Sequence, residues 1–296
     1  MEFMLGIEPL MKDLCQRWRD KSESYRPAGE PINVHRDGYY AEIVPKKVGK
    51  EFVQKHHYSG TYPATRLQVG LYRGSEEGNE LCGVAAFGVP MSNSVFARYI
   101  NKATIHDSIE LSRFVLLDDV PANGETWFLG QCFGKSGALL KDALNNISSV
   151  LAFSDPVKRT TLEGNTVMPG HIGTIYQAHN GQYLGRSHPK KMVLTENGKS
   201  VNKRMLSKLR NKESGQQYAR KWFEQHTGQV QLHSESNERY IKRTIANLRT
   251  VKHPGNHAYV WAIGDKRERK ETETRFKPSL LYPKSIDAVL PMPKAL

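Results

Sequence analysis

Apolar runs in the middle of the chain predict a sheet with helices between its strands. Two runs at 67–72 and 81–87 flank a polar, glycine-containing loop, which is the pattern of a β-hairpin. A third run at 109–117 alternates in its first half, and the short continuous run 150–154 is typical of a buried strand. Between these two, 127–145 has helical spacing. This order of elements predicts an α/β (α+β) fold with a mixed, largely antiparallel sheet flanked by helices.

The two ends of the chain differ from this middle part. Residues 1–50 form an irregular lead-in that ends in a predicted edge strand, and 51–225 contain the predicted catalytic core. Residues 226–296 form a basic C-terminal extension. Further elements are predicted toward the C-terminus, namely basic helices at 201–210, 216–225 and 237–248 and a strand at 257–263.

Positive charge is concentrated in the last third of the chain. The formal net charge is +13, yet residues 1–185 hold 19 Lys and Arg against 20 Asp and Glu, whereas 186–296 hold 24 against 10. A neutral body with a basic end indicates a polyanion such as DNA as partner. The candidate nucleic-acid contacts lie on one predicted helix: Lys203, Arg204, Lys208 and Arg210. A basic face that contacts only solvent is the alternative.

The composition argues against a membrane or secreted protein. No stretch approaches the roughly 20 apolar residues that a membrane-crossing helix needs, and the first residues do not have the pattern of a signal peptide. The cysteines Cys15, Cys82 and Cys132 are odd in number and lack a CxxC, which excludes a disulfide scaffold or a zinc cluster. We therefore expect no membrane partner and a location in the cytoplasm.

Two separate segments carry side chains suited to proton transfer and base stacking. His57 and Tyr58 stand in the segment HHYSG, where an imidazole is a natural proton acceptor and a phenol stacks or donates. A polar helix end is the alternative reading. Asp155 follows the strand at 150–154 and resembles the acidic residue in the D/N/S-P-P-Y/F/W motif of adenine-N6 methyltransferases. Because the second proline and the aromatic residue are missing, a methyltransferase is only the alternative chemistry.

A third segment resembles a donor-binding loop. It is not a P-loop, because Leu129 occupies the position of the first glycine. Instead, Gln131, Gly134 and Ser136 match the Q/R-x-x-G-x-G/A loop of the GNAT acyltransferases, whose backbone N–H groups at a helix N-terminus bind a phosphate-rich donor. A glycine-rich packing helix is the alternative.

Together, these segments resemble the Mom family of phage DNA-modification proteins over about residues 50–225. The resemblance implies a GNAT-like fold and conversion of DNA adenine to N6-carbamoylmethyladenine, which blocks host restriction enzymes. Iron has been associated with the family, but the sequence shows no decisive ligand set. The segments that carry the resemblance are His56–Gly60, Glu110–Phe114, Gln131–Gly137, Phe153–Pro156, Gly173–Tyr176 and Lys203–Ser207. The implied functional residues are His57, Tyr58, Arg113, Ser136, Asp155 and Tyr176.

The chemistry of adenine assigns an expected role to each of these residues. The N6 amine is a poor nucleophile, so a transferase must remove a proton, stabilise an oxyanion and draw the base out of the stack. Asp155 is the first choice for contact with the amine, and His57 is the alternative base. Tyr58 and Tyr176 are expected to stack on the base. Arg113 is expected to hold a phosphate, and Ser136 to bind the donor or the oxyanion.

The atoms of the implied product point to a donor. An acetyl group lacks the terminal amide nitrogen of a carbamoylmethyl group, whereas a glycyl ester supplies two carbons and one nitrogen. Glycyl-tRNA is therefore the hypothesised donor, with acetyl-CoA as the alternative, and tRNA becomes a possible partner beside double-stranded DNA. A basic DNA-binding protein without enzymatic activity is the rival interpretation.

Overall fold

The computed structural model describes residues 14–19, 22–27, 32–33, 37–76, 78–92, 94–134 and 139–285. The chain forms two compact units that interleave along the sequence. The first contains the described residues up to Ser154, Ile172–Arg186 and His257–Lys284, and the second contains Asp155–His171 and Ser187–Asn256. The division at residues 50 and 225, which charge and motif positions indicated, stays a prediction.

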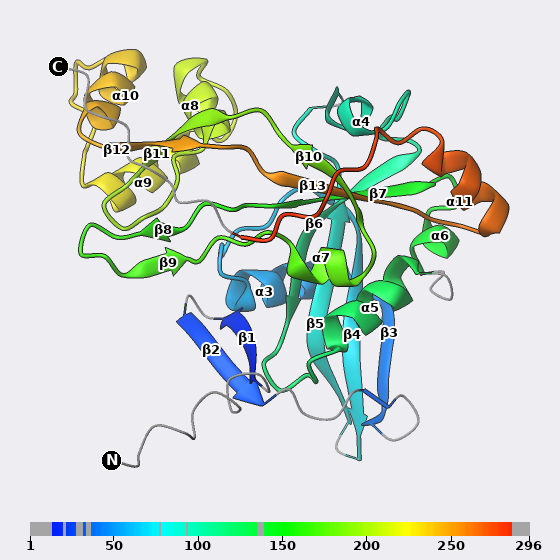
Figure 1. Ribbon diagram of the computed structural model, residues 1–296. Coiled ribbons are helices and arrows are strands. Elements are labelled where there is room, and N and C mark those ends of the chain that lie inside the picture. The colour runs from blue at the N-terminus through cyan, green and yellow to red at the C-terminus, as the bar shows by residue number, and fades with distance from the viewer. Residues whose placement is uncertain are drawn as a thin grey trace, which may run out of the picture. The chain divides into compact units, whose positions relative to one another are not determined.

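A seven-stranded sheet forms the centre of the first unit (Figure 1). β6 and β7 pair in parallel, while every other neighbouring pair of this sheet is antiparallel. The predicted mixed, largely antiparallel sheet is thus confirmed. In spatial order the strands are β10 (Gln182–Arg186), β13 (His257–Ala262), β7 (Ser149–Ser154), β6 (Ser108–Leu116), β5 (Gly78–Gly88), β4 (Thr65–Ser75) and β3 (Tyr39–Ile43).

Helices cover both faces of this sheet. On one face, α3 (Lys46–His56) packs Phe52 and Val53 against Val84 and Val115. On the other face, α5 (Gly124–Phe133) and α6 (Leu139–Ala143) join the largest core cluster. The remaining helices of this unit are α4 (Ser94–Tyr99), α7 (Thr174–Ala178) and α11 (Lys266–Glu273).

Two predicted elements differ in the structure. In place of the helix expected over 127–145, the structure has α5 and α6, and α5 ends at Phe133 because its C-cap, Gly134, has an extended backbone. A β-carbon at Gly134 would lie 2.7 Å from the carbonyl oxygen of Gly130, so this position favours glycine. β13 was expected in the basic extension but lies between β10 and β7. Its Ala258, Tyr259 and Val260 are fully buried. The strand is therefore part of the core, although the segments on either side of it are basic.

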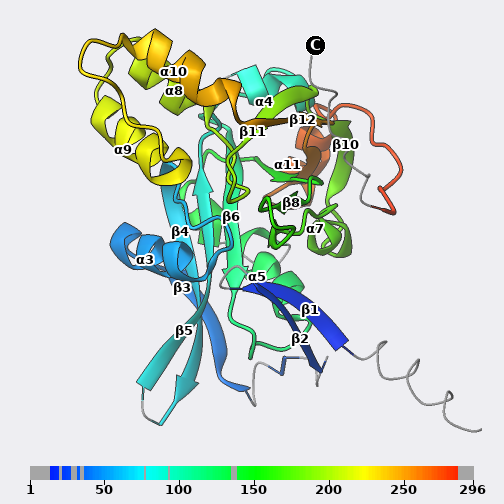
Figure 2. The same cartoon turned by 90° about the vertical axis from the view of Figure 1, so that its left-hand side faces the viewer.

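Three basic helices form the main body of the second unit (Figure 2). They are α8 (Lys203–Arg210), α9 (Gln216–Thr227) and α10 (Asn237–Ala246), and their presence confirms the prediction. Their shared core includes Leu209, Phe223 and Tyr240. Two-stranded pairs complete this unit: β8 (Arg159–Thr160) with β9 (Thr166–Met168), and β11 (Lys190–Leu194) with β12 (Arg249–His253). A further pair, β1 (Leu14–Arg19) with β2 (Ser22–Pro27), precedes the large sheet in the chain.

Candidate functional site

A β-bulge in β6 places a carboxyl group and a guanidinium group on one face of the sheet. Leu111 and Arg113 pair with consecutive residues of β5, so Ser112 is an extra residue in the strand. In a regular strand, residues three apart lie on opposite faces, but one inserted residue reverses that alternation. Leu111 therefore enters the larger core, while Glu110 and Arg113 share the opposite face, on which Val115 packs beneath α3.

The guanidinium group of Arg113 is held in one orientation by three hydrogen bonds. Its Nε donates to the carbonyl oxygen of Thr61 at 3.1 Å, and its Nη2 donates to the Thr61 hydroxyl at 2.9 Å. Its Nη1 donates to the carbonyl oxygen of Ser112 at 2.6 Å. Burial lowers the pKa of Arg113, while the nearby Tyr58, Glu110 and Tyr176 raise it. The result is a fixed cation beside an acid and within electrostatic range of two phenols.

Glu110 is a functional candidate that the sequence analysis did not single out. Burial raises the pKa of its carboxyl group, and the charge of Arg113 with a hydrogen bond from Ser112 offsets only part of that increase. A carboxyl group with a raised pKa is better matched to proton transfer near neutral pH than an ordinary glutamate. The available signal was an acidic residue inside the apolar run 109–117.

His57 and Tyr58 reach the site from the end of α3. The His57 N–H donates to the carbonyl oxygen of Val53 at 2.9 Å, which closes the helix. The Ser59 N–H donates to His57 Nδ1 at 3.1 Å, so in the neutral ring the proton is on Nε2. The rings of His57 and Tyr58 are 4.2 Å apart between centroids. This arrangement suits His57 to orient Tyr58 and leaves its Nε2–H as a hydrogen-bond donor, and the role of His57 as alternative base stays a prediction.

Tyr176 lies in the core and not on a surface where a base could stack. Its side chain is only 6% exposed, and its ring centroid is 5.6 Å from that of Tyr259 and 5.7 Å from that of Trp261. Burial raises the pKa of its hydroxyl, and Tyr58 and Glu110 raise it further. Tyr176 is therefore a protonated phenol in the core, within electrostatic range of Glu110 and Arg113, and its stacking on a base stays a prediction.

Asp155 belongs to the second unit and is surrounded by donors. Its Oδ1 accepts from the Val157 N–H at 2.9 Å and lies 3.1 Å from Nε2 of the fully buried His253, while its Oδ2 accepts from Arg159. Burial alone would raise the pKa of Asp155, but these partners outweigh it and hold the pKa below its usual value. His253 Nδ1 accepts from the Gly255 N–H at 3.0 Å, which leaves Nε2 as the donor to Asp155.

Of the expected donor-binding residues, the two that the structure describes, Gln131 and Gly134, lie at the C-terminal end of α5. Gln131 lies in the last turn of α5, and the Gly134 N–H donates to the carbonyl oxygen of Gly130 at 2.8 Å. The phosphate-binding geometry needs amides that have no helical partner, and the Gly134 amide has one. Ser136 lies outside the described residues.

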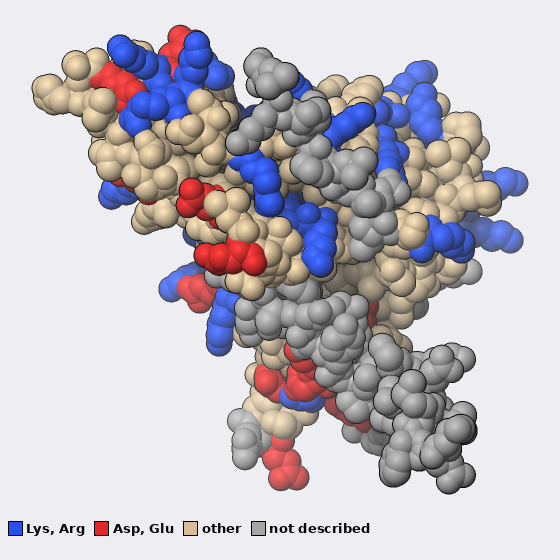
Figure 3. Space-filling model, turned by 60° about the vertical axis from the view of Figure 1, so that its left-hand side comes forward, with Lys and Arg blue, Asp and Glu red and all other residues tan. Residues whose placement is uncertain are grey.

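The basic helix of the second unit offers four cations with different surroundings. Lys203 and Arg210 are exposed, and Arg204 pairs with Glu213 at 2.6 Å. Lys208 is half-buried beside Gly215. The described residues of this unit hold 17 Lys and Arg against 7 Asp and Glu, and blue side chains are prominent on the face drawn in Figure 3.

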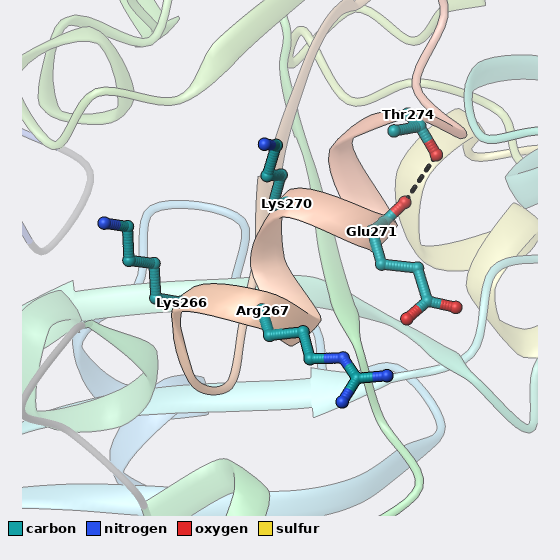
Figure 4. A pocket seen from close by; sticks show the side chains of 5 residues that line it. All are labelled: Lys266, Arg267, Lys270, Glu271 and Thr274. Carbon is teal, nitrogen blue, oxygen red and sulfur yellow. Dashed lines mark hydrogen bonds between the residues drawn. The ribbon is translucent and has the colours of Figure 1, made fainter.

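A surface hollow of the first unit is lined by none of these candidate residues. It has a volume of about 520 Å³ and lies along α11 in the first unit, where Lys266 and Lys270 extend from one side of the helix and Arg267 and Glu271 from another (Figure 4). Because the hollow is open and lined by one surface helix, we assign the chemistry to the cluster on β6 and α3 instead.

The side chains that the structure describes do not fit the iron that the family resemblance implied. No group of three or more His, Cys, Asp or Glu among them is placed to hold a metal ion. In the same part of the chain, no helix is both long and apolar enough to cross a bilayer.

Fold and site define a mixed α/β protein with a half-buried cluster of Glu110, Arg113, His57 and Tyr58 in one unit and a strongly basic second unit. The family model of the Mom protein family matches residues 38–278, and the chain belongs to this family. Mom proteins are phage DNA adenine-modification proteins, so membership implies an enzyme that acts on DNA. The match extends beyond residues 50–225 and includes β13 and α11. No curated protein matches the chain in sequence.

Proposed function

We propose that the protein converts adenine in double-stranded DNA to N6-carbamoylmethyladenine by aminoacyl transfer to the N6 amine, and thereby protects phage DNA from host restriction. One observation carries the proposal. In a chain of the Mom family, the bulge at Ser112 places Glu110 and Arg113 on one face of β6, within electrostatic range of the hydroxyls of Tyr58 and Tyr176.

In this proposal, Glu110 removes the proton from the attacking amine. Its raised pKa matches it to that step, whereas the lowered pKa and occupied oxygens of Asp155 make Asp155 a weak base. Asp155 instead becomes a positioning residue that holds the turn after β7. Arg113 stabilises the oxyanion that forms on the donor carbonyl, because its charge is fixed by hydrogen bonds before the substrate arrives.

Tyr58 is the proposed contact for the base that leaves the stack. It is half-buried at the end of α3, so part of the phenol remains accessible, unlike the ring of Tyr176. Flipping a base costs a few kcal/mol, which contacts to the extruded base must offset. His57 orients the Tyr58 ring, and Ser136 retains its proposed role beside the donor.

The proposed donor is glycyl-tRNA, because its atoms balance the product. The N6 nitrogen attacks the glycyl carbonyl carbon, an amide bond forms, and the tRNA hydroxyl leaves. The glycine amine then attacks C6, a new C6–N bond forms, and the original C6–N6 bond breaks. The former N6 becomes the terminal amide nitrogen, which gives the carbamoylmethylamino group without any oxidant or reductant.

Mass spectrometry of nucleosides from DNA of expressing cells tests the activity. A carbamoylmethyl adduct supports the proposal, a single methyl group would support the methyltransferase alternative, and unmodified adenine would support a protein that only binds DNA. The purified protein with DNA and charged glycyl-tRNA then tests the donor. Modification that depends on acetyl-CoA, and proceeds without charged tRNA, would exclude the aminoacyl route.

A further inference from the structure

Helix α9 has one apolar face in the core and one polar face in solvent. Ala219 and Phe223 are buried in the core of the second unit. The exposed stripe on the other side consists of Gln217, Tyr218, Lys221 and Gln225, whose spacing places them along one face of the helix. Tyr218 is 66% exposed, an unusually open position for a large aromatic residue.

The stripe has no structural partner in the part of the chain that the structure describes. None of its four side chains makes a hydrogen bond or ion pair there, whereas Arg220 of the same helix is bound by Asn237. The acidic residue of the helix, Glu224, borders the stripe and is half-buried. The exposed face therefore offers two amides, a phenol and an ammonium group, and no exposed carboxylate.

The support for this helix is rigid. The side chain of Asn237, the first residue of α10, donates through Nδ2 to the Leu209 carbonyl oxygen near the end of α8 at 2.6 Å. Its Oδ1 accepts from Arg220 of α9 at 3.3 Å. One side chain thus joins all three helices, and the Tyr240 hydroxyl adds a 2.6 Å hydrogen bond to the Gln229 carbonyl oxygen. A recognition surface needs such fixed geometry.

Helices α8 and α9 are joined by a short turn with two exposed cations, Arg210 and Lys212, at or near its start. The turn, residues 211–215, contains Lys212 at φ +52° and Gly215 at φ +83°, two left-handed positions that reverse the chain between the helices. Arg210 and Lys212 are exposed at the N-terminal side of α9. This order, a first helix, a turn with a glycine and an exposed second helix, is the order of a helix–turn–helix unit.

We propose that α9 enters the major groove of double-stranded DNA and that its exposed stripe contacts base edges. A Gln amide both donates and accepts, which matches adenine, and a Lys donates to the acceptors of guanine. The 12-residue helix is about 18 Å long, and the major groove, about 12 Å wide, admits such a helix. Arg210 and Lys212 then contact phosphates, which position the helix without reading sequence. The choice of DNA as partner rests on the proposed function.

The test is selection of bound sequences from random DNA duplexes by the full chain, with wild type compared to Gln217→Ala, Lys221→Ala and Gln225→Ala. Each variant should lose about tenfold discrimination at one or two base positions. Lys242→Ala, an exposed lysine of α10, is the control for Lys221, and Gln54→Ala on α3 is the control for the glutamines. Both controls should keep the wild-type preference. Thermal unfolding verifies that each variant is folded.

The possible results separate this inference from the proposed function. Binding selection requires no modification chemistry, so a sequence preference that the stripe variants alter supports α9 even if adenine remains unmodified. An unaltered preference, a uniform loss of affinity at all sequences, or no preference in the wild type would overturn it. A loss of tRNA binding with an unchanged DNA profile would also overturn it and would assign the stripe to tRNA.

Discussion

Glu110 in the first unit and Asp155 in the second are both carboxylic acids largely removed from water, yet their surroundings move their pKa values in opposite directions. For Glu110, burial dominates and the pKa rises. For Asp155, burial is also the largest single effect and would raise the pKa. His253, Arg159 and the Val157 N–H together outweigh it, so the pKa falls. Burial alone therefore does not identify a catalytic acid or base, because the number of donors around the carboxyl group decides which effect prevails.

The comparison also separates two tasks within the protein. Pairs of titratable groups whose environments move their pKa values apart commonly divide proton transfer from charge stabilisation. Here the carboxylate with more donors links the turn after β7 to β12, whereas Glu110 lies beside Arg113 on the face of the sheet that α3 covers. The following predictions test whether that division is correct.

The largest expected effect is on Glu110. Glu110→Gln keeps the size of the side chain and removes the proton acceptor, so modification of adenine should fall by about 10²-fold or more. Quantitative nucleoside mass spectrometry measures the rate, and Glu42→Gln on the exposed edge strand β3 is the control. Modification by folded Glu110→Gln at the wild-type rate would return the role of base to Asp155 or His57.

Asp155 should matter first for stability. Asp155→Ala leaves Arg159, which is 17% exposed, and the fully buried His253 without their acceptor, so unfolding should become easier by about 3 kcal/mol. Urea unfolding measures this change, with Asp142→Ala on the exposed side of α6 as the control. The stability of Asp155→Asn should lie between those of wild type and Asp155→Ala, because an amide oxygen still accepts from the Val157 N–H. A variant with wild-type stability and no modification would place Asp155 in the chemistry.

The basic helix α8 should affect binding more than chemistry. Replacing Lys203, Arg204 and Lys208 together with Ala should weaken DNA binding and flatten the plot of log K against log salt by about one unit per lost phosphate contact. Loss of the exposed Arg204–Glu213 pair should cost little stability. The triple variant Lys266→Ala, Arg267→Ala, Lys270→Ala on α11 removes the same charge from the first unit. Equal slopes for both triple variants would mean that total charge, not α8, determines binding.

Local patterns predicted most of the fold, because each strand of the β4–β5 hairpin and each of α8, α9 and α10 has its own apolar period. The place of β13 was not predictable, since pairing with β7 joins residues about a hundred positions apart. The same limit applied to the site. Glu110 stood in a recognised segment, but its role depends on a bulge, and Asp155 meets His253 across 98 positions. Neither environment is visible in local sequence.

The smallest expected effects are in the pH dependence. The contributions of Glu110 and Asp155 to stability should change in opposite directions with pH. Glu110 must be ionised to accept a proton, so the acid limb of the modification rate should have its midpoint above the ordinary glutamate value of about 4.3. Asp155 has a lowered pKa in the folded state. Its stabilising contribution is therefore present above the unfolded value of about 3.9 and is lost as pH falls through the lower folded value.

The effect of Glu110 on stability should have the opposite pH dependence to that of Asp155. Its folded pKa is raised, so the protonated form stabilises the native state at low pH, and that contribution is lost as pH rises through the folded value. Glu110→Gln, which cannot ionise, should therefore unfold at a higher temperature than wild type at neutral pH while being less active. Rate profiles and thermal unfolding from pH 3 to 8 measure both. A Glu110→Gln variant that is less stable at neutral pH, with an unchanged acid limb of the rate, would show that Glu110 is an ordinary ion-pair partner of Arg113.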